Sequence, residues 1–187
     1  GTWNGIYRSK DGGNTWEAAS TGLTGVDVHT LLQDSQDGTL YAGTGRGIYR
    51  SKHGGDTWEA AVSAGLTGVD VQTLLQDSRD GTLYAGTEIG IYRSKDGGDT
   101  WQTASSGLAT PVTTVEDYPW GLVGTWEVAG DIAELEGVDV STLLQDNRDG
   151  TLYAGTWYSI YRSRDGGDTW ESASAGLTDT HVLSLLR

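Results

Sequence analysis

Short apolar runs separated by Gly, Asp or Asn recur along most of the chain. Residues 26–62 show the pattern with the runs VDVHTLLQD, TLYAGT, GIYRSK and TWEAAV. Runs rich in β-branched, aromatic and leucine residues and bounded by turn formers are typical of short β-strands. An apolar spacing of three and four residues nowhere continues far enough for an amphipathic helix. We therefore predict an almost wholly β fold, with a longer helix expected at most near 131–135.

An Asp-Gly pair separates the first two runs wherever the full pattern occurs. This dipeptide is a strong hairpin signal because both central residues of the turn must tolerate a positive φ. The pattern thus predicts antiparallel neighbours joined by tight turns at Asp37-Gly38, Asp80-Gly81 and Asp149-Gly150.

The runs belong to a repeat with two landmarks. The first is SKDGGNTW at 9–16, which returns at 51–58, 94–101 and 163–170 with its tryptophans 42, 43 and 69 residues apart. The second, LLQDSQDGTLYAGT from residue 31, returns from residues 74 and 143. Four short antiparallel strands in about 42 residues are typical of one blade of a β-propeller. We predict a single propeller domain over 1–187.

The last interval is longer than the others and has two interpretations. The segment at 111–126 is PVTTVEDYPWGLVGTW. It shares a Val-x-Thr start and a closing Gly-Thr with DVQTLLQDSRDGTLYAGT at 70–87, which favours a degenerate unit. The alternative is an irregular insertion. We therefore expect units at about 1–30, 31–73, 74–110, 111–138 (degenerate) and 139–180.

The two ends of the sequence complement each other. The chain starts near the end of a second strand, and 181–187 has the pattern of a first strand. We expect a five-unit ring in which 181–187 joins the unit at 1–30. The alternative is a partial ring that a second copy completes through open strand edges, as a homo-oligomer.

The motif S-x-D-x-G-x-T-W resembles the Asp-box, or BNR, repeat, and four matches stand in register. Propellers with this repeat include sialidases, sortilin-type receptors, xyloglucan-cleaving hydrolases and photosystem assembly factors, so the fold alone does not settle the function. The resemblance implies that the box is a structural turn between the third and fourth strands, opposite the functional face. It also favours an extracellular or periplasmic location.

Each residue type suits that turn. A short carboxylate accepts hydrogen bonds from nearby N–H groups, glycine permits the reversal, and the tryptophan is expected to pack beneath the box. The second copy has His53 in place of the aspartate, so we expect it to be looser. The structural residues predicted in this way are Asp11, Trp16, Trp58, Asp96, Trp101, Asp165 and Trp170.

Composition narrows the classes of partner. With 12 basic and 26 acidic residues the formal charge is −14, which argues against nucleic acid and anionic membranes. Cysteine is absent, and no apolar run is long enough to span a membrane. Methionine and phenylalanine are absent beside 8 Trp and 9 Tyr, which leaves an engineered or trimmed origin open.

Most residues with catalytic potential follow the repeat. The arginines before each box, which could suggest a sialidase, share one register and are interpreted as structural. The loop acids Asp27, Asp70 and Asp139 also recur, whereas a catalytic carboxylate pair usually breaks the symmetry. Acidic hairpins such as DSQDG offer only two carboxylates, too few for Ca²⁺. We predict no catalytic residues, no metal and no cofactor. The repeated arginines are Arg8, Arg50, Arg93 and Arg162.

The turn after Gly-Thr, between the second and third strands, varies most between units. It should lie on the face opposite the Asp-boxes. Aromatic rings there suit stacking on sugars or anchoring a peptide. The alternative is that the rings cap the blades. The sequence thus predicts a non-catalytic module that binds a glycan or protein segment; the alternative is a glycoside hydrolase fragment. The predicted ligand-binding residues are Trp3, Arg46, Glu88, Trp126, Trp157 and Tyr158.

Overall fold

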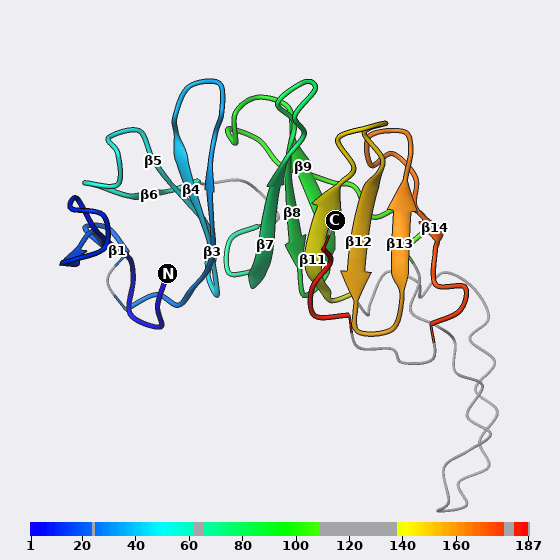
Figure 1. The fold of residues 1–187 in the computed structure, drawn as a ribbon, viewed down its shortest axis with the longest axis horizontal. Helices are drawn as coiled ribbons and strands as arrows, with labels where there is room; N and C mark the ends of the chain where they lie inside the picture. The colour runs from blue at the N-terminus through cyan, green and yellow to red at the C-terminus, as the bar shows by residue number, and fades with distance from the viewer. Residues whose placement is uncertain (24, 62–65, 109–137, 178–181, 187) are drawn as a thin grey trace, which may run out of the picture.

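The computed structural model describes residues 1–23, 25–61, 66–108, 138–177 and 182–186 (Figure 1). These residues form β-strands and turns and contain no helix, which confirms the predicted all-β class. The expectation of a helix near 131–135 lies outside the described residues.

Three sheets of the described residues have four antiparallel strands in chain order, and we call them blades one, two and three (Figure 1). A two-stranded sheet, called the half-blade, precedes them. The half-blade contains β1 (Tyr7–Arg8) and β2 (Glu17–Ala18). Blade one contains β3 (Val28–Gln33), β4 (Leu40–Thr44), β5 (Gly47–Ser51) and β6 (Glu59–Ala60). Blade two contains β7 (Val71–Gln76), β8 (Leu83–Thr87), β9 (Gly90–Ser94) and β10 (Gln102–Thr103). Blade three contains β11 (Val140–Gln145), β12 (Leu152–Thr156), β13 (Ile160–Ser163) and β14 (Glu171–Ser172).

The Asp-Gly turns form the expected hairpins between the first two strands of each blade. In blade one Gly38 has a φ of 79°, and the Asp37 carboxylate accepts a hydrogen bond of 2.8 Å from the Thr39 N–H. The same bond joins Asp80 to Thr82 at 2.9 Å. A short acidic side chain followed by glycine therefore fixes both the turn and the register of the strands.

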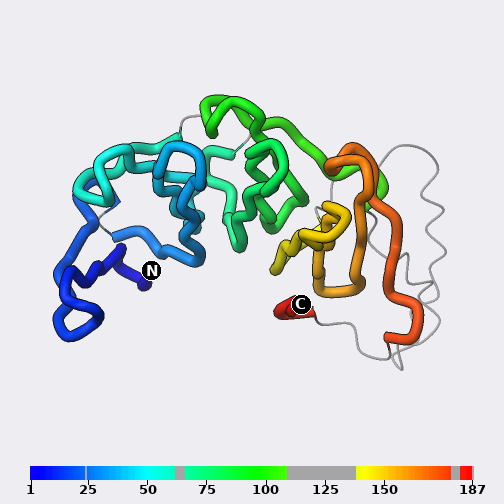
Figure 2. Tube along the Cα trace, turned by 45° about the horizontal axis from the view of Figure 1, so that its top comes forward, coloured from blue at the N-terminus to red at the C-terminus, as the bar shows by residue number. Residues whose placement is uncertain are grey.

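The blades stand side by side along an open arc, with β7 between β3 and β11 (Figure 2). A glycine of each second strand lies against a valine of the next first strand. A Cβ added at Gly43 would come within 2.8 Å of the Val71 side chain, and one at Gly86 within 2.8 Å of Val140. Blades can approach this closely only where the second strand has no side chain at that position.

Aromatic side chains fill the space between blades. Tyr41 of β4 packs with Ile48 of its own blade and with Leu74, Leu83 and Trp101 of blade two. Trp58 and Trp170 donate their indole N–H groups to the main-chain oxygens of Ala19 and Ala104, which belong to the preceding sheet, at 2.9 and 2.8 Å. The core is therefore a series of interfaces between neighbouring sheets.

Three of the four repeat tryptophans are buried. Trp58, Trp101 and Trp170 pack against the sheet before their own. The Trp58 ring also lies near its own Asp-box, where a Cβ added at Gly55 would come within 3.8 Å of it. Trp16 belongs to the half-blade, which is the first sheet of the arc, and its side chain is 64% exposed. The prediction that Trp16 is buried was wrong for that reason.

Blades two and three, which are separated by 109–137 in the sequence, contact each other directly. A Cβ added at Gly86 would come within 2.8 Å of the Val140 side chain, and β11 packs against β7 and β8. Whether that segment forms a degenerate unit lies outside the described residues.

The chain does not close on itself through its C-terminal strand. Val182 donates its N–H to the Thr156 oxygen at 3.2 Å and so occupies a first-strand position beside blade three. The half-blade, which that strand was expected to join, lies at the other end of the arc and has two strands (Figure 2). The described residues thus form a partial ring, and its completion by a second copy stays a prediction.

Candidate functional site

The variable turns lie at the end of each sheet opposite the Asp-boxes, and one threonine anchors each of them, which is buried in the three blades and exposed in the half-blade. The hydroxyl groups of Thr44, Thr87 and Thr156 donate to the main-chain oxygens that follow the turn, at 2.7, 2.8 and 3.0 Å. Thr2 does the same at 2.9 Å in the half-blade. The backbone of the turn is thereby held, and the residues at its tip project into solvent.

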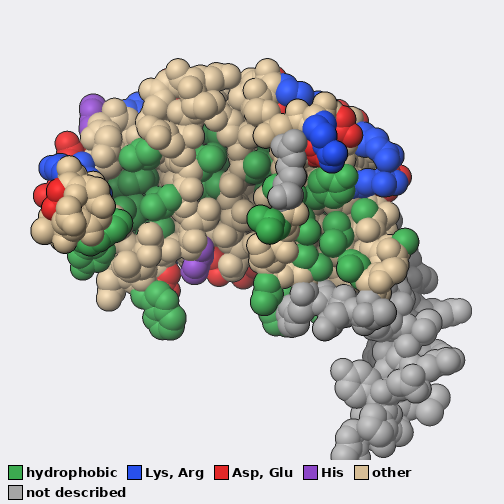
Figure 3. All heavy atoms as spheres, viewed as in Figure 1, with side chains coloured by type: hydrophobic (Ala, Val, Ile, Leu, Met, Phe, Trp, Pro, Cys, Tyr) green, Lys and Arg blue, Asp and Glu red, His purple; other side chains and the backbone are tan. Residues whose placement is uncertain are grey.

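The predicted ligand-binding side chains that the structure describes are all exposed. Trp3 is 85% exposed, Trp157 46% and Tyr158 50%. Arg46 and Glu88 are exposed at the corresponding turns of blades one and two. Trp126 lies outside the described residues. Figure 3 shows hydrophobic side chains protruding at the lower edge of the molecule, with acidic side chains and a histidine between them. We call this surface the variable face.

The variable face does not gather these residues into one cluster. Trp3 belongs to the half-blade and Trp157 to blade three, so two blades lie between them along the arc. The five-unit ring expected from the sequence would bring Trp157 beside Trp3, but the described residues of a single chain form an open arc that keeps them apart. Trp157 and Tyr158, which are consecutive in the β12–β13 turn, form the aromatic pair that the described face presents.

Between blades one and two the variable face holds a histidine–carboxylate contact that the sequence analysis did not identify. His29 Nε2 lies 3.0 Å from an Asp70 carboxylate oxygen. The Glu88 carboxylate accepts a bond of 3.4 Å from the Asp70 N–H. The sequence analysis identified Asp70 only as one of the repeated loop acids. His29 could have indicated the contact, because blades two and three have Gln72 and Ser141 at that position of the repeat.

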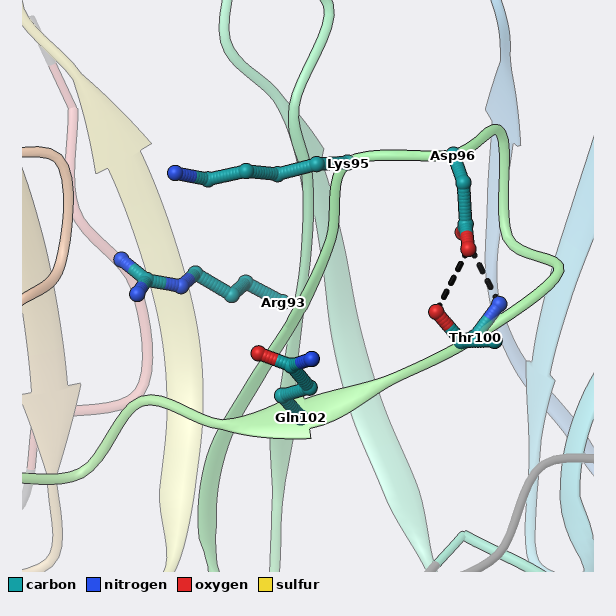
Figure 4. A pocket seen from close by; sticks show the side chains of 5 residues that line it. All are labelled: Arg93, Lys95, Asp96, Thr100 and Gln102. Carbon is teal, nitrogen blue, oxygen red and sulfur yellow. Dashed lines mark hydrogen bonds between the residues drawn. The ribbon is translucent and has the colours of Figure 1, made fainter.

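On the opposite face, each intact Asp-box ties its carboxylate to its own loop. Asp96 accepts a hydrogen bond of 2.8 Å from the Thr100 N–H, and both the Thr100 and Ser94 hydroxyl groups donate to it (Figure 4). Hydrogen bonds from the corresponding threonine, and then from the serine, lower the pKa of Asp11, Asp96 and Asp165 to about 2. These carboxylates are engaged within the turn, as the resemblance implied.

The second box keeps part of this arrangement. The Ser51 hydroxyl still accepts a bond of 3.0 Å from the Gly55 N–H, as Ser94 does from Gly98 at 2.9 Å. His53 supplies no carboxylate for Thr57, so the expected difference between this box and the others has a structural basis.

A shallow polar cavity of about 290 Å³ lies beside the Asp-box of blade two. In Figure 4 the Arg93 and Lys95 side chains extend away from Asp96, which faces Thr100. Arg93 reaches the next blade and forms an ion pair with Asp168, as Arg50 does with Asp99 and Arg8 with Asp56. Three of the four repeated arginines therefore link neighbouring sheets, whereas Arg162 pairs with Glu171 of its own blade. These contacts agree with the structural interpretation.

The carboxylates of the acidic hairpins also accept hydrogen bonds from neighbouring groups. Burial by itself raises the pKa of Asp77, but hydrogen bonds from Arg79 lower it to about 2. Asp34 accepts bonds of 2.8 Å from the Gln36 N–H and from the Gln76 side chain. In the part of the chain that the structure describes, no group of three or more His, Asp or Glu side chains could hold a metal ion. That part also contains no helix suited to crossing a membrane.

Comparison with known proteins agrees with this geometry. Residues 161–172 match the family model of the BNR/Asp-box repeat. A search of curated proteins finds no matching sequence. Among solved structures, the extracellular domain of a putative one-component system from B. thetaiotaomicron aligns with a TM-score of 0.69 at 16% identity, over 98% of this chain and 22% of that one.

Two further structures have the same fold. The GH74 xyloglucanase from Xanthomonas campestris aligns with a TM-score of 0.63 at 21% identity, over 95% of this chain and 28% of that one. YCF48 from Cyanidioschyzon merolae aligns with a TM-score of 0.61 at 17% identity, over 96% of this chain and 52% of that one. The chain thus spans about a fifth to a half of these proteins. It carries the Asp-box repeat, and the four-stranded sheets of its described residues are β-propeller blades.

Proposed function

We propose that the protein is a non-catalytic propeller module that binds a glycan on the variable face, with Trp157 and Tyr158 as the main contact. One observation carries the proposal: these two consecutive rings are about half exposed at a turn where blades one and two present Arg46 and Glu88. The repeat does not determine which residues stand at this position, and hydrogen bonds from a threonine hold the backbone of the turn. Aromatic side chains at such a position suit ligand recognition.

The chemistry of the face favours a neutral glycan. Indole and phenol rings offer flat apolar surfaces with a polar edge, which suit the apolar faces and hydroxyl groups of a sugar. The formal charge of −14 and the acids Asp70 and Glu88 on the same face disfavour an anionic ligand. The likeness to a xyloglucanase suggests xyloglucan oligosaccharides as a first probe. Trp3, Arg46 and Trp126 belong to the proposed set as secondary contacts.

Calorimetric titration of the full chain with xyloglucan oligosaccharides and a panel of other neutral glycans tests the proposal. Trp157→Ala should weaken binding by about 2 kcal/mol, or about 30-fold, as truncation of a central aromatic contact does. Trp16→Ala is the matched control, because Trp16 is also an exposed tryptophan but lies at an Asp-box. It should leave the affinity unchanged.

The same samples distinguish binding from hydrolysis. A non-catalytic module should release no new reducing ends from any glycan that it binds. Reducing ends that appear at a rate proportional to protein concentration would favour the glycoside hydrolase alternative. Affinity for a peptide but for no glycan would move the proposal to a protein segment. Equal affinities of the Trp157→Ala variant and the unmodified chain would exclude this turn as the contact.

A further inference from the structure

The polar cavity beside the Asp-box of blade two is lined by a cross-strand pair that differs from its counterparts. In every described sheet the arginine before the box stands opposite the residue that follows the box tryptophan. In blade two this pair is Arg93 and Gln102. Blade two thus has a neutral amide where the other sheets have a carboxylate. The other pairs are Arg8 with Glu17, Arg50 with Glu59, and Arg162 with Glu171.

The glutamate of the other sheets binds the basic side chains around it. Arg8 Nε and Lys10 Nζ lie 3.0 and 2.7 Å from the same Glu17 oxygen. In blade one, Glu59 lies 2.9 Å from Arg50 Nε. One carboxylate is therefore the partner of one or two cations at each of these boxes. The corresponding groups of blade three are Arg162 and Arg164, at 2.6 and 2.8 Å from Glu171.

The two cations of blade two lack this partner. Arg93 uses Nη1 for its ion pair with Asp168 and for its hydrogen bond to the Gly166 oxygen, so its Nε has no acceptor among the described residues. Lys95 is exposed and forms no ion pair with a described residue. Gln102 likewise makes no side-chain hydrogen bond within the described part of the chain. Two donors and one amide are therefore open to a ligand.

The cavity keeps the space that a carboxylate would need. A glutamine side chain has nearly the shape of a glutamate side chain, so the difference at this position removes a charge without filling the site. Figure 4 shows Arg93 and Lys95 extending in the same direction, with Gln102 below them. Asp96 and Thr100, which complete the lining, are bonded to each other on the other side of the loop (Figure 4).

The local charges also leave room for one more anion. At the half-blade box, Arg8 and Lys10 lie among the three carboxylates of Asp11, Glu17 and Asp56.

The box of blade two has the same number of cations but only two carboxylates, those of Asp96 and Asp168. A ligand carboxylate would therefore only restore the balance that the half-blade box already holds. The total charge of −14 disfavours anions elsewhere, but salt screens distant charges more than groups in contact.

We propose that this cavity binds a small hydroxy-carboxylate, such as a uronic acid. The ligand carboxylate takes the place of the glutamate carboxylate and accepts hydrogen bonds from Lys95 Nζ and Arg93 Nε, which are strong because both partners are charged. The Gln102 amide, which can donate and accept, binds a hydroxyl group. A volume of about 290 Å³ suits one small molecule. The inference is independent of the glycan proposal, because the cavity lies on the Asp-box face.

The probe is sodium glucuronate, which is added to the full chain and followed in ¹H–¹⁵N NMR spectra. The Lys95 amide signal and the Gln102 side-chain amide signals should shift in a saturable manner. Glucose has a similar ring without the carboxylate and should shift neither. Acetate should bind several-fold more weakly than glucuronate, because it has no hydroxyl group for Gln102. Sodium chloride at the same ionic strength should not reproduce the shifts.

Three variants locate the site. Gln102→Glu supplies the carboxylate that the other sheets have and should abolish binding by pairing with both cations. Lys95→Gln removes one cation and should weaken binding about tenfold or more, the range for a hydrogen bond to a charged group. Thr103→Glu is the matched control, because it adds the same charge on the other face of β10. It should bind glucuronate within about twofold of the unmodified chain.

The same spectra show whether each variant is folded, and several results would overturn the proposal. One is glucuronate binding that the Gln102→Glu variant retains, and another is an unchanged affinity of the Lys95→Gln variant. Shifts that glucose or sodium chloride reproduces would show that no carboxylate is recognised. Acetate that binds as tightly as glucuronate would overturn the assignment of a hydroxylated ligand.

Discussion

The Tyr84 hydroxyl donates a hydrogen bond of 2.8 Å to the Gly166 main-chain oxygen, which lies 82 positions later in the chain. Tyr41 makes the corresponding bond to Gly97 at 2.7 Å. Burial, followed by nearby carboxylates, raises the pKa of both phenols to about 12. Each bond therefore joins a second strand to the Asp-box loop of the following blade.

Removing this hydroxyl should lower the stability by a small and measurable amount. Tyr84→Phe is expected to reduce the free energy of unfolding by about 0.5–1.5 kcal/mol in urea titrations, since the part-buried Gly166 oxygen loses one of its two donors and keeps Arg93. Tyr153 has the same repeat position in blade three but makes no hydroxyl bond among the described residues. Tyr153→Phe should change the stability by less than about 0.5 kcal/mol. Equal losses would show that the bond to Gly166 contributes nothing.

Two tryptophans of the repeat should respond very differently to truncation. Trp101 is 5% exposed and packs against blade one, so Trp101→Ala should cost about 3–5 kcal/mol by leaving a cavity. Trp16 is 64% exposed, and Trp16→Ala should cost less than about 0.5 kcal/mol. Thermal and urea unfolding measure both. A large loss for Trp16→Ala would mean that the half-blade has a partner over this ring.

A single methyl group at the blade interface should be costly. A Cβ at Gly86 would approach the Thr73 side chain to 2.6 Å and the Val140 oxygen to 2.9 Å. Gly86→Ala is expected to destabilise the chain by about 1–3 kcal/mol through overpacking. Gly45→Ala is the control, because its Cβ would meet only His29, at 3.8 Å. A neutral Gly86→Ala would show that blades two and three can separate without loss.

Acid should weaken the Asp-boxes in a defined pH window. The folded pKa of Asp96 is about 2, below the usual 3.8, so the unfolded chain binds the proton more tightly. The stabilisation is fully present above about pH 4 and is lost as the pH falls towards 2. Asp96→Asn resembles the protonated form. Its deficit in unfolding free energy should therefore be largest at pH 5 and shrink by pH 2, and a constant deficit would contradict the assignment.

Local structure was predictable because its causes are local. The apolar run that contains VHTLLQ, the Asp37-Gly38 turn and the Asp-box loops act within a few residues, and the structure confirms the blades that they predict. The partner of each interface could not be predicted in this way. The spacing from Trp58 to Trp101 does not reveal that each indole packs against the preceding sheet. Nor does the sequence reveal that blades two and three contact each other directly.

The sequence was sufficient to predict which turns carry the candidate site, but not how those turns lie relative to one another. Comparing units identified Arg46, Glu88, Trp157 and Tyr158 as tips that the repeat does not explain, and the structure exposes all four. The structure does not bring Trp3 near Trp157, because that would require ring closure, which is a long-range property that the repeat does not determine. The pair of His29 and Asp70 also escaped notice, since its members come from adjacent blades.

The glycine-to-valine contacts between blades also determine how the chain should share its stability. Every described interface joins neighbouring sheets only, so the free energy of folding is approximately a sum of nearest-neighbour terms, as in a one-dimensional array. Blade two, with a neighbour on either side, gains two such terms, whereas the half-blade gains one. The arc is therefore built to open from its ends inward, and its cooperativity is set by the interfaces more than by the blades themselves.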